Sequence, residues 1–175
     1  MKKVIKGLVL FIMIISYCNL SAQVDDRGYI LKVGDNIPDS IILKLTDGSI
    51  VNVNQLNGKV VLLQFTASWC SVCAKEMPHL ENEVWQVYKD KGLVFIGIDR
   101  DEPLNVVKKF KKKLKITYPL ALDPRATIFG KFANKEAGVT RNVLIKDGKI
   151  IFLTRLYDEV EFNALKNKIA EVFAQ

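Results

Sequence analysis

The chain has 175 residues, of which 49% are hydrophobic, and its 26 basic and 19 acidic side chains give a formal net charge of +7. This length suits one ordinary domain with a substantial core, and three cysteines are too few for a framework of stapling disulfides. The excess of positive charge is too small to indicate nucleic-acid or membrane binding by itself.

The chain begins with the features of a secretion signal. Three lysines precede an apolar stretch over residues 7–17, which is shorter than the roughly 20 residues needed to span a bilayer. Leu20-Ser21-Ala22 forms a suitable cleavage site, so we predict a signal peptide over residues 1–22. The remaining residues, 23–175, would form a single domain of 153 residues with a net charge of +4 and two cysteines.

Export to the periplasm is therefore expected, with the mature protein in solution. The alternative is a lipoprotein anchored through Cys18, although the bulky Tyr17 makes this stretch a loose match to a lipoprotein box. Peripheral membrane contact is expected only if Cys18 is lipidated.

The first predicted elements are strands. Residues 23–31 are polar and are expected to be loose. Residues 41–45 and 50–53 flank an Asp47-Gly48 turn, an arrangement typical of a β-hairpin. Residues 59–65 form a short, mostly apolar run rich in β-branched side chains, which predicts a buried strand.

A pair of cysteines follows this strand. Cys70 and Cys73 stand three residues apart, where an apolar pattern of helical spacing begins. The unpaired N–H groups at a helix N-terminus favour an anion, so we expect the pKa of the Cys70 thiol to lie well below about 8.5. Cys73 is one turn further on, close enough to form a disulfide with Cys70. Cys70 would attack a disulfide, and Cys73 would then resolve the mixed disulfide.

Other roles for the cysteine pair are weaker. A closed zinc site needs four ligands, and outside the pair the chain offers only Cys18 and His79. Haem attachment needs a histidine directly after the second cysteine, where Ala74 stands instead. A purely structural disulfide between residues three apart would restrain the unfolded chain little. A redox function is therefore favoured, and no metal or other cofactor is expected.

The motif Trp69-Cys70-x-x-Cys73-x-x-Glu76-x-Pro78 after a buried strand resembles the thioredoxin superfamily. The glutamate and the secretion signal make the chain most similar to the TlpA/ResA-like thiol–disulfide oxidoreductases. The resemblance implies an α/β, thioredoxin-like three-layer fold, in which a central mixed β-sheet is flanked by helices and carries an N-terminal β-hairpin and an inserted helix. It also implies protein thiols and disulfides as partners, and a membrane or periplasmic thiol as the electron donor.

The same resemblance makes Glu76 an active-site acid. Glu76 follows Cys73 by three residues and so lies on nearly the same helix face. Partial burial beside a thiol would raise the pKa of its carboxyl group, which could then carry the proton of thiol exchange. Classical thioredoxins instead place an aspartate six residues before the first cysteine, where this chain has Gln64, which cannot titrate.

The remainder of the chain alternates helices and strands. The helix after Cys70 is predicted to run to about residue 91, to kink at Pro78 and to stop at Gly92. A helix over residues 103–115 carries a run of lysines, which we interpret as a solvated face because the apolar residues between them repeat at helical spacing. The other predicted elements are strands at 93–98 and 118–122, a short helix at 126–133, a hairpin at 142–146 and 149–155, and a last helix at 158–173.

The loop expected to face the cysteines departs from the family pattern. Thioredoxin-like proteins carry a cis-proline there, whereas this chain has Val139-Thr140-Arg141 and no proline after Pro124. A cis bond before Thr140 would cost about 2.5–4 kcal/mol, so a trans bond is expected. Arg141 is either a cation that lowers the pKa of Cys70 and binds an acidic partner, or an arginine in solvent. Trp69 either offers a flat apolar surface to a partner or simply packs, and with residues 139–141 it completes the predicted substrate-binding set.

The sequence therefore favours an exported protein thiol–disulfide oxidoreductase that acts as a reductase, with Cys70, Cys73 and Glu76 as catalytic residues. One alternative is a peroxiredoxin-like thiol peroxidase, which shares the fold and also lacks the cis-proline. Its characteristic threonine and proline positions hold Ala67 and Leu63 here, so that pattern fails. A further alternative is a non-enzymatic metal-binding or chaperone module. No nucleic-acid partner is expected.

Overall fold

The computed structural model describes residues 27–174, so the predicted signal peptide, its cleavage site and Cys18 lie outside the described residues. The described chain forms a seven-stranded mixed sheet with the strand order β2-β1-β5-β4-β3-β6-β7. The strands are β1 (Ile42–Leu45), β2 (Ile50–Asn52), β3 (Val60–Thr66), β4 (Val94–Arg100), β5 (Leu120–Asp123), β6 (Arg141–Lys146) and β7 (Lys149–Arg155).

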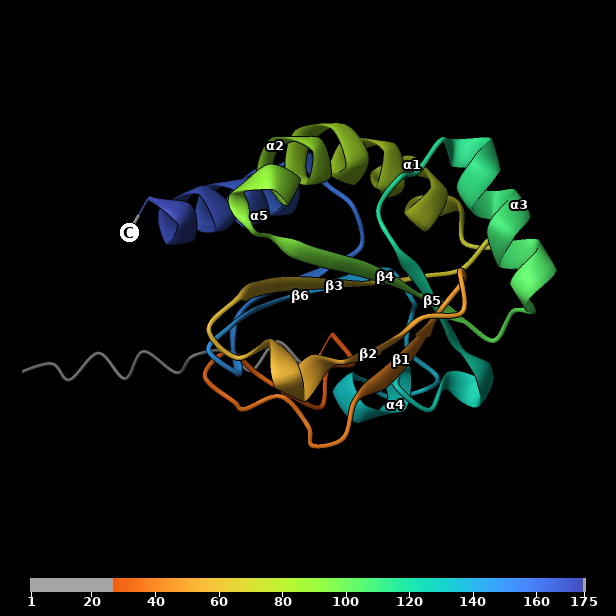
Figure 1. Cartoon of the computed structure of the whole chain (residues 1–175), viewed down its shortest axis with the longest axis horizontal. Coiled ribbons are helices and arrows are strands. Elements are labelled where there is room, and N and C mark those ends of the chain that lie inside the picture. The colour runs from red at the N-terminus through yellow and green to blue at the C-terminus, as the bar shows by residue number, and fades with distance from the viewer. Residues whose placement is uncertain (1–26, 175) are drawn as a thin grey trace, which may run out of the picture.

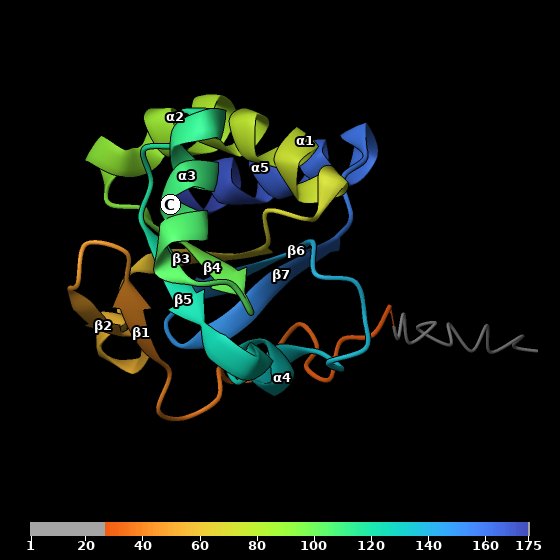
Figure 2. The same ribbon diagram turned by 90° about the vertical axis from the view of Figure 1, so that its right-hand side faces the viewer.

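Helices cover both faces of this sheet, which confirms the predicted three-layer, thioredoxin-like α/β fold (Figure 1). One face carries α1 (Ser71–His79), α2, α3 and α5, the other face carries α4 (Phe129–Phe132), and the β1–β2 hairpin lies at one edge (Figure 2). No helix within residues 27–174 combines the length and the apolar composition needed to cross a membrane. The helices are α1 (Ser71–His79), α2 (Gln86–Tyr88), α3 (Leu104–Leu114), α4 (Phe129–Phe132) and α5 (Glu159–Phe173).

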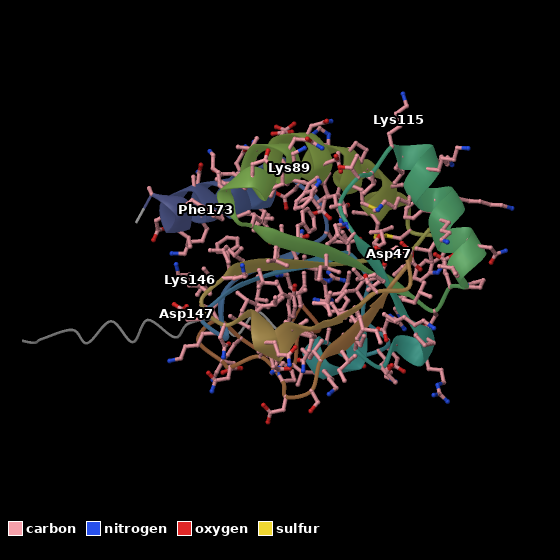
Figure 3. The ribbon with its side chains drawn as sticks, viewed as in Figure 1. Asp47, Lys89, Lys115, Lys146, Asp147 and Phe173 are labelled. Carbon is pink, nitrogen blue, oxygen red and sulfur yellow. A yellow bond between two sulfur atoms is a disulfide. The ribbon has the colours of Figure 1, made fainter. Side chains whose placement is uncertain are left out.

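The central strand β3 organises both halves of the core. Every residue of β3 is buried, and the strand pairs in parallel with β4 and antiparallel with β6. Because alternate residues of a strand point to opposite faces, Leu63 and Phe65 pack with α4, whereas Val60 and Leu62 pack with α1, α3 and α5. Side chains fill the space on both sides of the sheet (Figure 3). The cysteine pair follows shortly after the carboxyl end of β3, at the start of α1.

The predicted N-terminal hairpin is confirmed. The Asp47 carboxylate accepts hydrogen bonds from the Ser49 backbone N–H at 2.9 Å and from its hydroxyl at 2.6 Å. Gly48, in the same turn, adopts a left-handed φ of +94°, which favours glycine. Strand β1 pairs with β5, so the hairpin extends the sheet at the edge away from β6 and β7.

The helix that follows Cys70 is interrupted, as Pro78 predicts. A π-helical segment, Leu80–Trp85, separates α1 from α2, and a 3₁₀ turn over Lys89–Lys91 ends at Gly92, whose φ is +99°. Proline has no N–H to donate, and its ring crowds the carbonyl of the preceding turn. The regular α-helix ends at His79, one residue after Pro78, and the widened π-helical turns begin there.

The helix α3 confirms the interpretation of its lysines as a solvated face. Val107 and Phe110 are buried, Val106 and Leu114 are half-buried, and most of the lysines between them are exposed. Lys115, just after the helix, points away from the sheet (Figure 3).

The expectation of a loose N-terminal stretch is wrong for residues 27–31. Tyr29 forms a β-bridge with Ala133, and its hydroxyl lies 2.6 Å from the carbonyl oxygen of Thr154, to which it donates. The guanidinium group of Arg141 packs over the Tyr29 ring, 4.3 Å from its centre. Contacts with residues far away in the sequence hold this segment, so no periodic pattern in the sequence predicts it.

Candidate redox site

The candidate site forms where β3 ends and α1 begins. Cys70 is the N-cap of α1, and its Sγ accepts a hydrogen bond from the backbone N–H of Cys73 at 3.1 Å. The first N–H groups of a helix have no partner within the helix, and the Cys70 sulfur satisfies one of them. The same N–H and the helix dipole would stabilise a negative charge on that sulfur in the reduced protein.

Cys70 and Cys73 are joined by a disulfide, and their Cα atoms are 5.3 Å apart. The two cysteines are both largely buried but differ in accessibility, because Cys70 as a residue is 9% exposed and Cys73 is 0% exposed. A thiolate must reach the sulfur that it attacks, so only Cys70 can meet a disulfide of another molecule directly. Within residues 27–174, no group of three or more histidine, cysteine or acidic side chains is arranged to hold a metal ion.

Thr140 closes the site from the opposite side. Its Oγ1 lies 3.1 Å from the Sγ atoms of both Cys70 and Cys73. Residues 27–174 contain no cis peptide bond, so the bond before Thr140 is trans, as expected. Val139 is buried, which leaves this member of the predicted substrate-binding set little surface to offer a partner.

Glu76 lies one helical turn beyond Cys73 and is only 2% exposed. Its Oε1 accepts a hydrogen bond from Asn142 Nδ2 at 2.7 Å, and its Oε2 accepts one from Gln64 Nε2 at 3.2 Å. Burial raises the pKa of the Glu76 carboxyl group to about 7, and the two amide donors, which favour the carboxylate, oppose that rise. Glu76 can therefore gain and lose a proton near neutral pH.

The amide groups that hold Glu76 belong to a network that the sequence analysis did not predict. Asn142 on β6 pairs with Gln64 on β3, and Asn142 also donates to Thr154 Oγ1 at 2.9 Å. Gln64 accepts a hydrogen bond from the Tyr118 hydroxyl at 2.8 Å. The only signal in the sequence is a neutral polar side chain inside each of two apolar strands. Its meaning depends on the strand register, which the sequence does not give.

The expectations that Arg141 lies in solvent or binds an acidic partner are both wrong. Its side chain is fully buried, and its guanidinium group donates to the carbonyl oxygens of Gly138 at 3.1 Å and Arg27 at 2.6 Å. Arg141 and Asn142 are neighbours on β6, so they point to opposite faces of the sheet. Asn142 therefore reaches Glu76, whereas Arg141 packs under the sheet against Tyr29.

The loop before Cys70 exposes Trp69 and is held by hydrogen bonds to Glu102, which lies near the buried Asp99. Trp69 is 63% exposed, which excludes simple packing, and its use as a surface for a partner stays a prediction. Ser68 donates its backbone N–H and its hydroxyl to the Glu102 carboxylate, each at 2.5 Å. Asp99 is fully buried at the end of β4, and burial, with the nearby Glu102 charge, raises its pKa to about 8. This pair was missed, because acids at the end of a strand are common in any sequence.

Comparisons with known proteins agree on one family. The model of the AhpC/TSA family matches residues 33–152. A thiol-disulfide oxidoreductase ResA of Bacillus cereus is 34% identical over 121 residues, which cover 69% of this chain and 68% of that protein.

Solved structures give the same result. A candidate protein disulfide isomerase from Bacteroides thetaiotaomicron is 53% identical, with a TM-score of 0.81 over 85% of this chain and 94% of that chain. A candidate thiol:disulfide interchange protein DsbE from Chlorobium tepidum is 26% identical, with a TM-score of 0.69 over 82% of this chain and 99% of that chain.

The fold and the cysteine pair at the start of α1 define a thioredoxin-like thiol–disulfide oxidoreductase, which confirms the predicted class of enzyme. The chain belongs to the AhpC/TSA family and is similar to the ResA oxidoreductases.

Proposed function

We propose that the protein reduces disulfides in client proteins, with Cys70 as the nucleophile, Cys73 as the resolving thiol and Glu76 as the proton carrier. One observation carries this proposal: the two sulfurs of a single disulfide differ in access. Cys70 reaches the surface at a helix N-terminus, whereas Cys73 is buried one turn away from a carboxyl group with a pKa of about 7.

The proposed cycle has two exchanges. In the reduced protein, the Cys70 thiolate attacks one sulfur of a client disulfide, forms a mixed disulfide and releases the other client sulfur as a thiolate, which takes a proton from water. Cys73 then gives its proton to the Glu76 carboxylate and attacks Cys70 Sγ, which forms the Cys70–Cys73 disulfide and releases the second client sulfur as a thiolate. That thiolate takes a proton from water, and Glu76 later returns its own proton to water. The client gains two electrons and the protein loses two. An external thiol donor, in the membrane or the periplasm, returns them.

Thr140 supports both exchanges in this scheme. Its hydroxyl lies 3.1 Å from each sulfur, so it can donate to whichever sulfur carries the negative charge. Glu76 accepts a hydrogen bond from Asn142, which lies on β6 two residues after Thr140, so the start of β6 and the residue just before it supply hydrogen-bonding groups to both halves of the site.

The proposed location is the periplasm, with residues 1–22 as a cleaved signal peptide and residues 23–175 as the mature thioredoxin-like domain. The support is the basic and apolar pattern at the N-terminus. Sequencing the N-terminus of protein recovered from cell fractions tests this, because cleavage after Ala22 leaves Gln23 first. Recovery of a fatty-acylated Cys18 from the membrane fraction would instead establish the lipoprotein alternative.

The direct test of the redox role combines trapping with a potential measurement. The Cys73→Ser variant should accumulate mixed disulfides with clients, whereas Cys70→Ser should accumulate none. Equilibration of the wild type with glutathione buffers gives its potential, which for a reductase should lie nearer about −270 mV than about −120 mV. A Cys73→Ser variant that forms no adducts would remove the assignment of Cys70 as the nucleophile.

Disulfide isomerisation is a second candidate, favoured by the 53% identity to the candidate isomerase of Bacteroides thetaiotaomicron. Scrambled ribonuclease separates the two activities, because an isomerase restores its activity while a reductase leaves it reduced. Consumption of hydrogen peroxide by the reduced protein would indicate the peroxidase alternative.

A further inference from the structure

A groove lies directly beside the loop that carries the nucleophilic cysteine. Its volume is about 250 Å³, and it runs between Ser68 and one face of α3. Ser68 stands only two residues before Cys70, and two residues of extended chain span at most about 7 Å. A client whose disulfide lies against Cys70 would therefore place residues adjacent to its cysteine in or near this groove. The lining residues are Ser68, Val106, Lys109, Phe110 and Lys113.

The spacing of these residues explains how one helix forms a wall of the groove. Val106, Lys109, Phe110 and Lys113 follow one another at intervals of three, one and three residues, so they share one face of α3. Phe110 is buried and Val106 is half-buried, which gives the groove an apolar floor. Lys109 and Lys113 are exposed and stand one helical turn apart along its rim.

The charge of this rim is not neutralised within the described chain. Among residues 27–174, neither Lys109 nor Lys113 forms an ion pair with a carboxylate, and α3 itself contains no acidic residue. The Glu102 carboxylate, which contacts the groove residue Ser68, already accepts two hydrogen bonds from it. Two unpaired cations over an apolar floor are complementary to a chain segment that carries both carboxylates and an apolar side chain.

We propose that this groove binds the acidic segment next to the target disulfide of a client protein, with an apolar client side chain on Val106 and Phe110 and client carboxylates on Lys109 and Lys113. This inference rests on the proposed function, because it names the class of client that the Cys70 site receives. It also assigns the lysines of α3 different tasks. Lys111 donates to the Tyr118 carbonyl oxygen at 2.7 Å, whereas Lys109 and Lys113 face the groove.

The test uses two synthetic peptides, each closed by one disulfide and containing one leucine beside a cysteine. They differ only in that the flanking positions hold three glutamates in one and three lysines in the other. The wild type should reduce the glutamate peptide with a kcat/KM at least tenfold higher than the lysine peptide, and added salt should diminish this preference. Rates are normalised to the reduction of bis(2-hydroxyethyl) disulfide, a neutral substrate too small to fill the groove.

The chain offers a closely matched control. Lys109→Glu/Lys113→Glu should lower the preference for the glutamate peptide about tenfold or reverse it. Lys108→Glu/Lys112→Glu makes the same charge change on the same helix, at exposed positions outside the groove, and should change the preference less than threefold. Equal losses in the two variants would overturn the proposal, since they would show a general effect of net charge.

A binding measurement separates this proposal from the proposed function. The same peptides with both cysteines replaced by serine test the groove without any exchange chemistry. The glutamate version should bind the wild type at least tenfold more tightly than it binds Lys109→Glu/Lys113→Glu. If the wild type reduced no disulfide but still bound the glutamate peptide in this way, only the proposed redox function would be refuted. If the wild type bound the glutamate and lysine peptides equally, the proposal that the groove binds an acidic segment would be refuted. It would also be refuted if Lys109 and Lys113 bound anionic vesicles in preference to the glutamate peptide.

Discussion

Replacing Glu76 with glutamine should change how the stability of the oxidised protein depends on pH. Burial raises the pKa of the Glu76 carboxyl group from 4.5 to about 7. Between these values the folded protein holds a proton that the unfolded chain has released. The contribution of Glu76 to the free energy of unfolding is therefore largest below about pH 4.5 and is lost as the pH rises to about 7. A salt-bridged carboxylate shows the opposite dependence, because its contribution is lost as the pH falls. The difference between the two pKa values corresponds to about 3 kcal/mol.

Urea unfolding of the oxidised wild type and of Glu76→Gln, from about pH 4 to about pH 8, measures this effect. The free energy of unfolding of the wild type should fall by about 3 kcal/mol relative to the variant, with most of the fall below pH 7. Glu136→Gln replaces an exposed glutamate and serves as the matched control. If the free energy of unfolding of the wild type, relative to that of Glu76→Gln, did not change with pH or increased as the pH rose, the assignment of a buried, protonated Glu76 would be refuted.

In the reduced protein, iodoacetamide should modify Cys70 at least tenfold faster than Cys73, because only Cys70 reaches the surface; peptide mass spectrometry measures this, and equal rates would contradict the geometry. Thr140→Val removes the hydroxyl 3.1 Å from both sulfurs and should slow exchange with a neutral disulfide about tenfold at pH 7, whereas an unchanged rate would show that the hydroxyl has no role. Arg141→Ala should lower the free energy of unfolding by about 3 kcal/mol, because it deletes a buried guanidinium group, and should leave the exchange rate of Cys70 unaltered. A large change in the exchange rate of Cys70 with little loss of stability would show instead that Arg141 acts at the redox site.

The parts of the site that lie close together in the sequence could be predicted from it. The strand before Cys70 and the helix after it follow from local patterns, and the structure contains both. The predicted interruption of that helix near Pro78 takes the form of a π-helical segment that begins at Leu80. Glu76 follows from the same local pattern, because its position on the helix is fixed relative to Cys73.

Of the parts that are distant in the sequence, Thr140 could be placed beside the cysteines only through the family resemblance, and the strand residues that contact Glu76 could not be predicted. The pairing of Gln64 with Asn142 decides which amide reaches Glu76, and it depends on how β3 and β6 align. Arg141 was misplaced for the same reason, because a shift of one residue along a strand moves a side chain to the other face. The anchoring of Tyr29 depends on long-range contacts with Ala133, Arg141 and Thr154, which leave no trace in local composition.

The burial of Cys73 also bears on how the protein would withstand oxidants. The more accessible thiol, that of Cys70, would be oxidised first to a sulfenic acid, and a second oxidation to a sulfinic acid is irreversible in most proteins. Sulfenic acids condense readily with a nearby thiol, and the Cα atoms of the two cysteines are only 5.3 Å apart. Because dissolved oxidants do not reach Cys73, that thiol stays available for this condensation. Damage at the surface cysteine is thereby converted into a bond that an ordinary thiol donor can repair.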